Sequence, residues 1–319
     1  MTADAPWISI CGLNHKEGVK MSNSTKMKFR AHDTFFIRKG WLHKGMRNVR
    51  EDNSIFMGTG GNPMDILGIG ANMVKSLRYW LQATGLTIEP TRGRRTQTLT
   101  SFGDIILKND PYIEEMGTLW LIHYNLAKNI EDATAWYFFF NEFSQTEFEK
   151  DDYIVKLKNF IRMSNAPEVS ERSLEDDFNC IINTYVSRSK SHPGKVLPET
   201  NIDCPLGELG LIDIIDKKRK IYRKASPQKD GIHPLIVLAV IIDQAKGNKE
   251  IKISSIQTDY MNAGMIFNLD LILLTQLLTR IELLGFIKVE RTAGLDIIRL
   301  NTEMTFLECV QHYFDNINK

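Results

Sequence analysis

Residues 67–99 constrain the fold of this chain more than any other stretch. Glycines within 67–70 permit a tight turn, and the apolar spacing over 71–84 then predicts one helix that ends at a glycine. Two short strands, 86–89 and 94–99, follow around an arginine-containing turn. A turn, a helix and a hairpin in this order are typical of a winged helix-turn-helix.

The polar side of predicted helix 71–84 carries two cations and four uncharged hydrogen-bonding groups but no acid. Such a face suits the phosphate-lined groove of a nucleic acid. The ordinary alternative is an amphipathic helix with a solvated cationic side. The basic, aromatic segment 34–45 and the hairpin tip add further cations, which favours nucleic-acid binding. The residues that we expect to contact DNA are Arg38, Lys39, Lys44, Asn72, Lys75, Ser76, Arg78, Tyr79, Arg92, Arg94 and Arg95.

Charge is distributed unevenly along the chain. Residues 1–100 hold 15 Lys and Arg against 7 Asp and Glu, residues 101–200 hold 10 against 17, and residues 201–319 hold 15 of each. The net charge of +1 therefore hides a basic first third and an acidic middle. This asymmetry assigns a nucleic-acid surface to the first third.

We expect a mainly α-helical fold with short β-hairpins (α+β), in which several winged helix-turn-helix-like units surround a helical middle. The expected domains are a flexible N-terminal extension over 1–25, a basic winged-helix-like DNA-binding unit over 26–100, an acidic helical middle with winged-helix-like packing over 101–225, and a C-terminal winged-helix-like unit over 226–319.

The two later units lack the cationic helix of the first. Predicted helix 170–185 exposes acids, and predicted helix 270–284 has one cation, so both are expected to serve in packing. Dense aromatic residues over 133–143 predict a helical core rather than an exposed binding platform. His123 is accordingly expected to be a core histidine.

Sequence features also bear on location. No apolar run reaches the roughly 18–20 residues of a membrane span, and no signal-peptide pattern opens the chain. The four cysteines form no C-x-x-C pair, which is typical of thiols in a reducing compartment. We therefore expect a cytoplasmic protein without a membrane partner.

Candidate catalytic residues are few. Glu250-Ile251-Lys252 matches half of a common nuclease core, but it lacks an aspartate partner in strand context, so a chance match is favoured. In the basic third, the most economical cluster joins His43, Glu51 and Asp52. The histidine can act as acid or base, and the carboxylates can hold Mg²⁺ or Mn²⁺.

Segments 36–45 and 67–80, together with 110–124 and 204–212, resemble a bacterial family long catalogued as a domain of unknown function. That family includes the SspB-type DNA-nicking protein of phosphorothioation-based phage defence. The resemblance implies DNA and other phosphorothioation-system proteins as partners, and single-strand nicking as the activity. The chain departs from the family's pattern at Ala71, where a further lysine is usual.

Two classes of function follow. In the first, the protein nicks one DNA strand to assist modification, with Mg²⁺ or Mn²⁺ as cofactor. In the second, it is a non-catalytic DNA-binding adaptor or transcriptional regulator that recruits partner proteins. The resemblance favours nicking, whereas the missing metal motif favours the adaptor.

Overall fold

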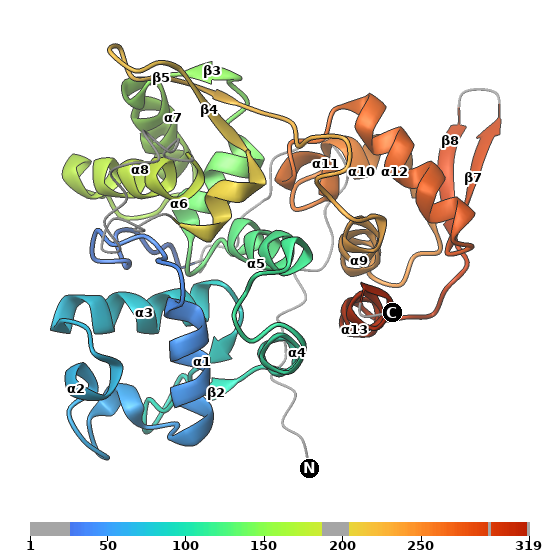
Figure 1. Cartoon of the computed structure of the whole chain (residues 1–319). Coiled ribbons are helices and arrows are strands. Elements are labelled where there is room, and N and C mark those ends of the chain that lie inside the picture. Colours follow the sequence, from blue (N-terminus) through green and yellow to red (C-terminus); the bar gives the residue numbers. More distant parts are fainter. Residues whose placement is uncertain (1–25, 187–203, 293–294, 318–319) are drawn as a thin grey trace, which may run out of the picture.

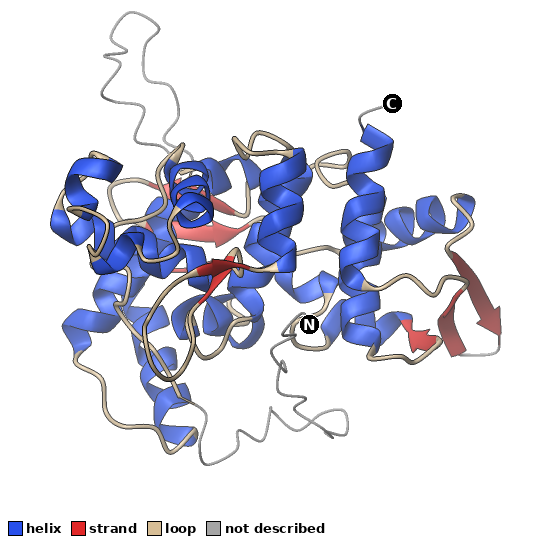
Figure 2. Cartoon of the chain, turned by 90° about the horizontal axis from the view of Figure 1, so that it is seen from below, coloured by secondary structure: helices blue, strands red, loops and turns tan. Residues whose placement is uncertain are grey.

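The computed structural model describes residues 26–186, 204–292 and 295–317. Helices make up most of the described chain, and the strands form small antiparallel sheets at its edges (Figures 1 and 2). The expected mixed fold with a helical majority is therefore confirmed. We refer below to the first region (26–100), the middle region (101–225) and the C-terminal region (226–317). The expected extension over 1–25 lies outside the described residues.

The first region contains the predicted helix and hairpin. Gly85 adopts a left-handed conformation (φ 72°), and the Leu86 amide donates to the Leu81 carbonyl, which ends the helix as its sequence predicted. The elements are α1 (Trp41–Glu51), the 3-10 helix η1 (Ile55–Met57), α2 (Pro63–Leu67), α3 (Ala71–Ala83), β1 (Thr87–Ile88) and β2 (Thr98–Leu99).

Helix α5 of the middle region begins at Met116, five residues after Pro111. The Asp110 carboxylate accepts hydrogen bonds from the Glu114 and Glu115 amides, which holds the preceding residues in a turn. The elements are α4 (Ser101–Asn109), α5 (Met116–Lys128), α6 (Thr134–Tyr137), the π-helix η2 (Phe138–Glu142), β3 (Glu147–Phe148), α7 (Lys150–Met163), α8 (Glu171–Tyr185), the 3-10 helix η4 (Pro205–Leu209), β4 (Ile212–Asp216) and β5 (Ile221–Lys224).

The C-terminal region contains the helix predicted over 270–284, as α12, and ends in a final helix. The elements are α9 (Pro234–Ala245), β6 (Glu250–Lys252), α10 (Ile253–Thr258), α11 (Ala263–Ile266), α12 (Leu271–Leu283), β7 (Ile287–Thr292), β8 (Leu295–Leu300) and α13 (Phe306–Ile317). In Figure 1, α13 lies beside α9 and closes this region.

The three regions share an order of elements. In the middle region the strands lie in the order β3-β5-β4, and in the C-terminal region in the order β6-β8-β7, so the last strand of each sheet is central. Helices separate the first strand from the hairpin in both cases (Figure 1): α7, α8 and η4 in the middle region, and α10, α11 and α12 in the C-terminal region. In the first region the backbone amide of Gln97, just before β2, donates to the Asn53 carbonyl at 2.9 Å. Asn53 thus takes the position beside the last strand that the first strand has in the other two sheets.

The core runs through all three regions as one cluster of buried residues. Trp136 and Phe139 are 0% exposed, so the prediction of a helical aromatic core is confirmed. His123 is equally buried, between the Tyr185 hydroxyl and the Ile266 carbonyl.

No single helix among the described residues is long and apolar enough to cross a membrane. The pair Ile253–Ile266 and Leu271–Leu283, bent by 90°, meets the length and composition requirement together.

Candidate nucleic-acid interface

The start of α3 presents an open, electropositive surface. Gly70 precedes the helix and provides no side-chain cap, so the first backbone N–H groups lack intrahelical acceptors. A Cβ atom added at Gly68 or Gly70 would meet nothing within 4 Å, which leaves room for a ligand to approach the backbone. Asn72 and Lys75 are exposed one turn further along. Backbone amide donors, the positive end of the helix dipole and one ammonium group thus lie together at the N-terminus of α3, an arrangement that suits a phosphate.

Two of the predicted contact residues on α3 are buried. Ser76 is 0% exposed and its hydroxyl donates to the Phe35 carbonyl at 3.3 Å. Tyr79 is 8% exposed and its hydroxyl donates to the Asp132 carbonyl at 3.0 Å. Their predicted exposure is wrong because α3 packs on two sides, and the hydroxyl groups find backbone acceptors inside the protein.

Arg78 is held by the hairpin rather than left free. Its guanidinium contacts the Glu89 carboxylate at 2.5 Å and donates to the Arg95 carbonyl at 3.0 Å. Glu89, whose side chain is 5% exposed, also contacts Arg95 and accepts from the Gln97 amide side chain. This carboxylate fixes the hairpin on α3, so Arg78 supports the site instead of supplying a free charge.

Two arginines at the tip of the β1–β2 hairpin remain available. Arg92 and Arg94 are exposed, and neither has an ionic partner among the residues that the structure describes. Lys75 has none within the same set. The exposed cations of helix and hairpin therefore belong to one supersecondary unit, as the sequence predicted.

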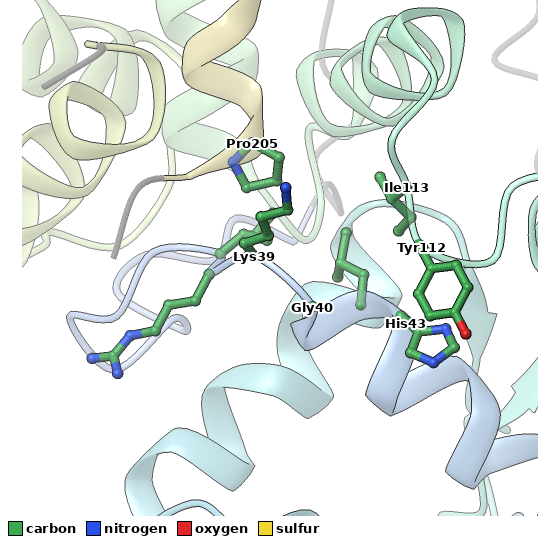
Figure 3. Close-up of a pocket in the computed structure, with 9 residues that line it drawn as sticks. Lys39, Gly40, His43, Tyr112, Ile113 and Pro205 are labelled. Atoms are coloured by element: carbon green, nitrogen blue, oxygen red, sulfur yellow. The ribbon is translucent and has the colours of Figure 1, made fainter. Parts of the chain in front are cut away.

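The cations before and within α1 have different surroundings. The Arg38 guanidinium lies 5.7 Å from the Phe35 ring centroid and 5.3 Å from that of Trp41, a cation–π arrangement. The Lys44 ammonium group donates to the Leu67 carbonyl at 2.8 Å and so ties α1 to the end of α2. Lys39 is exposed and extends toward Pro205 at the edge of a shallow crevice (Figure 3).

His43 lines the same crevice. Its Nδ1 lies 2.8 Å from the Pro111 carbonyl, and its ring lies beside that of Tyr112 (Figure 3), with the centroids 4.5 Å apart and the planes tilted by 31°. The crevice has a volume of about 10 Å³, enough for roughly one water molecule. It does not accommodate a nucleotide in this conformation.

The predicted catalytic cluster does not assemble. His43 is near the start of α1, whereas Glu51 ends it and Asp52 follows. Eight residues of helix correspond to about 12 Å along the axis, too far for a shared proton or ligand. Glu51 is instead paired with Arg47 at 3.1 Å on the exposed side of α1.

The hydrogen bonds of Asp52 favour the ionised form of its carboxyl group. Its Oδ1 accepts hydrogen bonds from the Ser54 hydroxyl at 2.6 Å and the Ser54 amide at 2.8 Å. These hydrogen bonds, that of the hydroxyl first, lower the pKa of the carboxyl below its ordinary value. Asp52 is therefore ionised at neutral pH and is not a general acid.

His43, Glu51 and Asp52 do not form a metal-binding site by themselves. Across residues 26–186, 204–292 and 295–317, no three His, Cys, Asp or Glu side chains lie together in a way that could hold a metal ion. Glu51 and Asp52 are the adjacent carboxylates of the basic region, and Mg²⁺ bound by one or two carboxylates takes its remaining ligands from water and phosphate. Two carboxylates alone therefore do not complete a magnesium site.

The whole fold is similar to two solved structures. A magnesium ion-bound SspB crystal structure superposes with a TM-score of 0.78 at 22% identity, over 92% of this chain and 89% of that one. A second SspB crystal structure gives the same TM-score and identity, over 93% and 91%. At this identity the similarity establishes the fold.

No curated protein matches the sequence. The profile of a family described as "Protein of unknown function (DUF4007)" matches residues 29–314, nearly the full length of the chain. The sequence segments that resembled a family of unknown function all lie within this match. The protein is a member of the DUF4007 family.

Proposed function

We propose that the protein binds duplex DNA through its first region, as a component of a bacterial phosphorothioation-based defence system. One observation carries the DNA-binding part: the open N-terminus of α3, Lys75 and the β1–β2 tip present donors and cations on one unit, whose one acid, Glu89, is paired with Arg78 and Arg95. The family resemblance and the SspB fold support the defence context.

The repeated order of elements supports a winged-helix interpretation of all three regions. A winged helix has a strand, two helices and a hairpin, and its second helix enters the major groove. In this interpretation α3, α8 and α12 are equivalent. Of the three helices, only α3 contains no acidic residue, whereas four acids lie along α8 and Glu282 lies on α12. On α12, Leu271 and Ile272 are also 61% and 72% exposed.

The test replaces Lys75, Arg92 and Arg94 with glutamine in one variant. Each phosphate contact contributes about 0.9 to the slope of log affinity against log salt, so losing three contacts reduces the slope by about 2–3. A control variant carries glutamine at Lys229, Lys246 and Lys252, three exposed cations of the C-terminal region. If both variants show the same slope of log affinity against log salt, the first region is not the DNA interface.

Strand nicking is the second candidate function. The observation that favours it is the ionised carboxylate of Asp52 beside the hairpin. This carboxylate lies next to Glu51 and is one residue from the Asn53 carbonyl that pairs with Gln97. Bound Mg²⁺ supplies charge neutralisation at a scissile phosphate. Asp52 and Glu51 are the side chains of the basic region that can hold it, and His43 is too far along α1 to share the site.

A plasmid-relaxation assay with Mg²⁺ or Mn²⁺ separates the two functions. If the wild type nicks, Asp52→Asn should lose nicking and keep its DNA affinity, whereas His43→Ala should keep both. Neither residue supplies the positive charge on which nonspecific affinity depends. A wild type that binds DNA but leaves supercoiled plasmid intact with either metal acts as a non-catalytic adaptor.

A further inference from the structure

The middle region carries a second strongly basic tip. The turn between β4 and β5 reads Asp216-Lys217-Lys218-Arg219-Lys220, four consecutive cations after one acid. All four are exposed, and the structure gives them no ionic partner within its described ranges. In Figure 1 this turn projects beyond β3 and the helices, away from the body of the protein.

The turn is ordered by its own acid. The Asp216 carboxylate accepts hydrogen bonds from the backbone amides of Lys218 and Arg219 at 2.8 and 3.0 Å. Lys220 adopts a left-handed conformation (φ 58°), and the register of the two strands shifts between Ile214 and Asp216. The one negative charge of the tip is thereby committed to the backbone, and four like charges are held close together.

Holding four ammonium and guanidinium groups together beside a single carboxylate is electrostatically unfavourable, and a polyanion relieves the repulsion. The β4–β5 tip also occupies the same place in its region as the β1–β2 tip does in the first, since each joins the two strands that follow the helices of its region. Residues 216–220 include no apolar side chain that could enter a bilayer, and the exposed Ile215 lies before the tip, on β4. These features fit a nucleic-acid backbone better than a lipid surface.

The α-helix that precedes this hairpin in the chain, α8, does not share its charge. The exposed face of α8 carries Glu171 and Glu175, which pair with Lys158 at 2.7 Å and with Lys150 at 3.0 Å. A face of paired acids gains nothing from entering a groove lined with phosphates. The tip can therefore contact DNA only through the phosphate backbone.

We propose that the β4–β5 tip is a second, sequence-independent DNA contact, which binds backbone phosphates beyond the segment held by α3 and the β1–β2 hairpin. This inference rests on the proposed DNA binding of the first region. It assigns to the middle region a DNA contact in addition to the packing role expected from its sequence, and it makes affinity depend on duplex length.

The test compares short and long duplexes. A variant with glutamine at Lys217, Lys218, Arg219 and Lys220 should match the wild type on a duplex of about one helical turn, roughly 10 base pairs. On a duplex of about three turns it should bind roughly tenfold more weakly at low salt, with a salt slope reduced by about 2–3. The control carries glutamine at Arg162, Lys229, Lys246 and Lys252, which removes the same charge from exposed sites elsewhere.

The outcomes separate this inference from the proposed function. If the tip variant and the control behave alike on long duplexes while the Lys75, Arg92 and Arg94 variant still loses affinity, the second contact is wrong and the first stands. If the wild type binds no duplex, both fail. If the tip is needed for binding anionic lipid vesicles and not for binding long duplexes, the surface contacts membranes instead.

Discussion

At the scale of single residues, the buried polar groups show how the interior satisfies its hydrogen bonds. His123 is fully buried, with Nδ1 2.7 Å from the Tyr185 hydroxyl and Nε2 2.8 Å from the Ile266 carbonyl. A carbonyl can only accept, so Nε2 carries the proton and Nδ1 accepts from the tyrosine. Burial lowers the pKa of this histidine to about 4, so it is a neutral link between the middle and C-terminal regions.

This pKa predicts a loss of stability in mild acid. The unfolded chain protonates the histidine below about pH 6.5, whereas the folded protein keeps it neutral down to about pH 4. The unfolded state therefore binds more protons in this window, and the free energy of unfolding falls as the pH drops through it. Urea denaturation at several pH values should show a weaker pH dependence for His123→Gln than for the wild type. If the free energy of unfolding depends equally on pH in both proteins, His123 is not the group that titrates in this window.

At the scale of elements, close backbone approach fixes how α4 docks on the first region. A Cβ atom added at Gly103 would lie 2.0 Å from the Leu86 carbonyl oxygen, a backbone atom that cannot move aside alone. The Thr100 side chain caps the helix by accepting from the Gly103 amide and donates to the Gly85 carbonyl. The end of α3, the start of β1 and α4 are thus positioned together.

Gly103→Ala should accordingly destabilise the protein. Overpacking of this kind costs about 1–3 kcal/mol or more, because either α4 or the Leu86 backbone must shift. Ser101→Ala, an exposed change two residues earlier in the same helix, should stay within about 0.5 kcal/mol of the wild type. Chemical denaturation measures both. A Gly103→Ala variant as stable as Ser101→Ala would show that the approach is looser than the structure has it.

At the scale of the whole molecule, contacts between residues far apart in sequence tie the regions together. The buried His32 ring contacts the Asp177 carboxylate at 2.7 Å and links the first region to α8. Asp243 on α9 accepts from the Tyr124 hydroxyl and contacts the Lys128 ammonium group at 2.9 Å, which links the C-terminal region to α5. One continuous core underlies these links.

We therefore expect the three regions to unfold together. No tryptophan follows Trp136 in the sequence, so tryptophan fluorescence reports on the first two regions and, through the contact of Trp120 with Phe267, on their junction with the third. Far-ultraviolet circular dichroism reports on all three regions. The two denaturation midpoints should coincide, as in two-state unfolding. Asp243→Ala should lower both equally, and Gln276→Ala, at an exposed site on α12, should change neither. A fluorescence midpoint that ignores Asp243→Ala would indicate a C-terminal region that unfolds alone.

The sequence by itself determined the local elements and the charge distribution. Helix α3 and the hairpin after it follow from an apolar repeat bounded by glycines, and α8 begins at Ser170, whose side chain accepts from the Ser173 amide as a capping residue does. Caps, glycine boundaries and apolar repeats involve residues within about one helical turn of each other, so they can be recognised in the sequence. The basic character of the first region is likewise a property of composition.

Only the tertiary structure decided which polar groups remain available. Tyr79 donates to a carbonyl 53 residues away, and Arg78 is held by Glu89, so neither is the free surface group that the helical pattern predicted. His43 is separated from Asp52 because α1 is one continuous helix, and the two were grouped only by their closeness in sequence. Helical periodicity tells which residues share a face, but what covers that face depends on segments distant in the chain, whose contacts leave no local pattern.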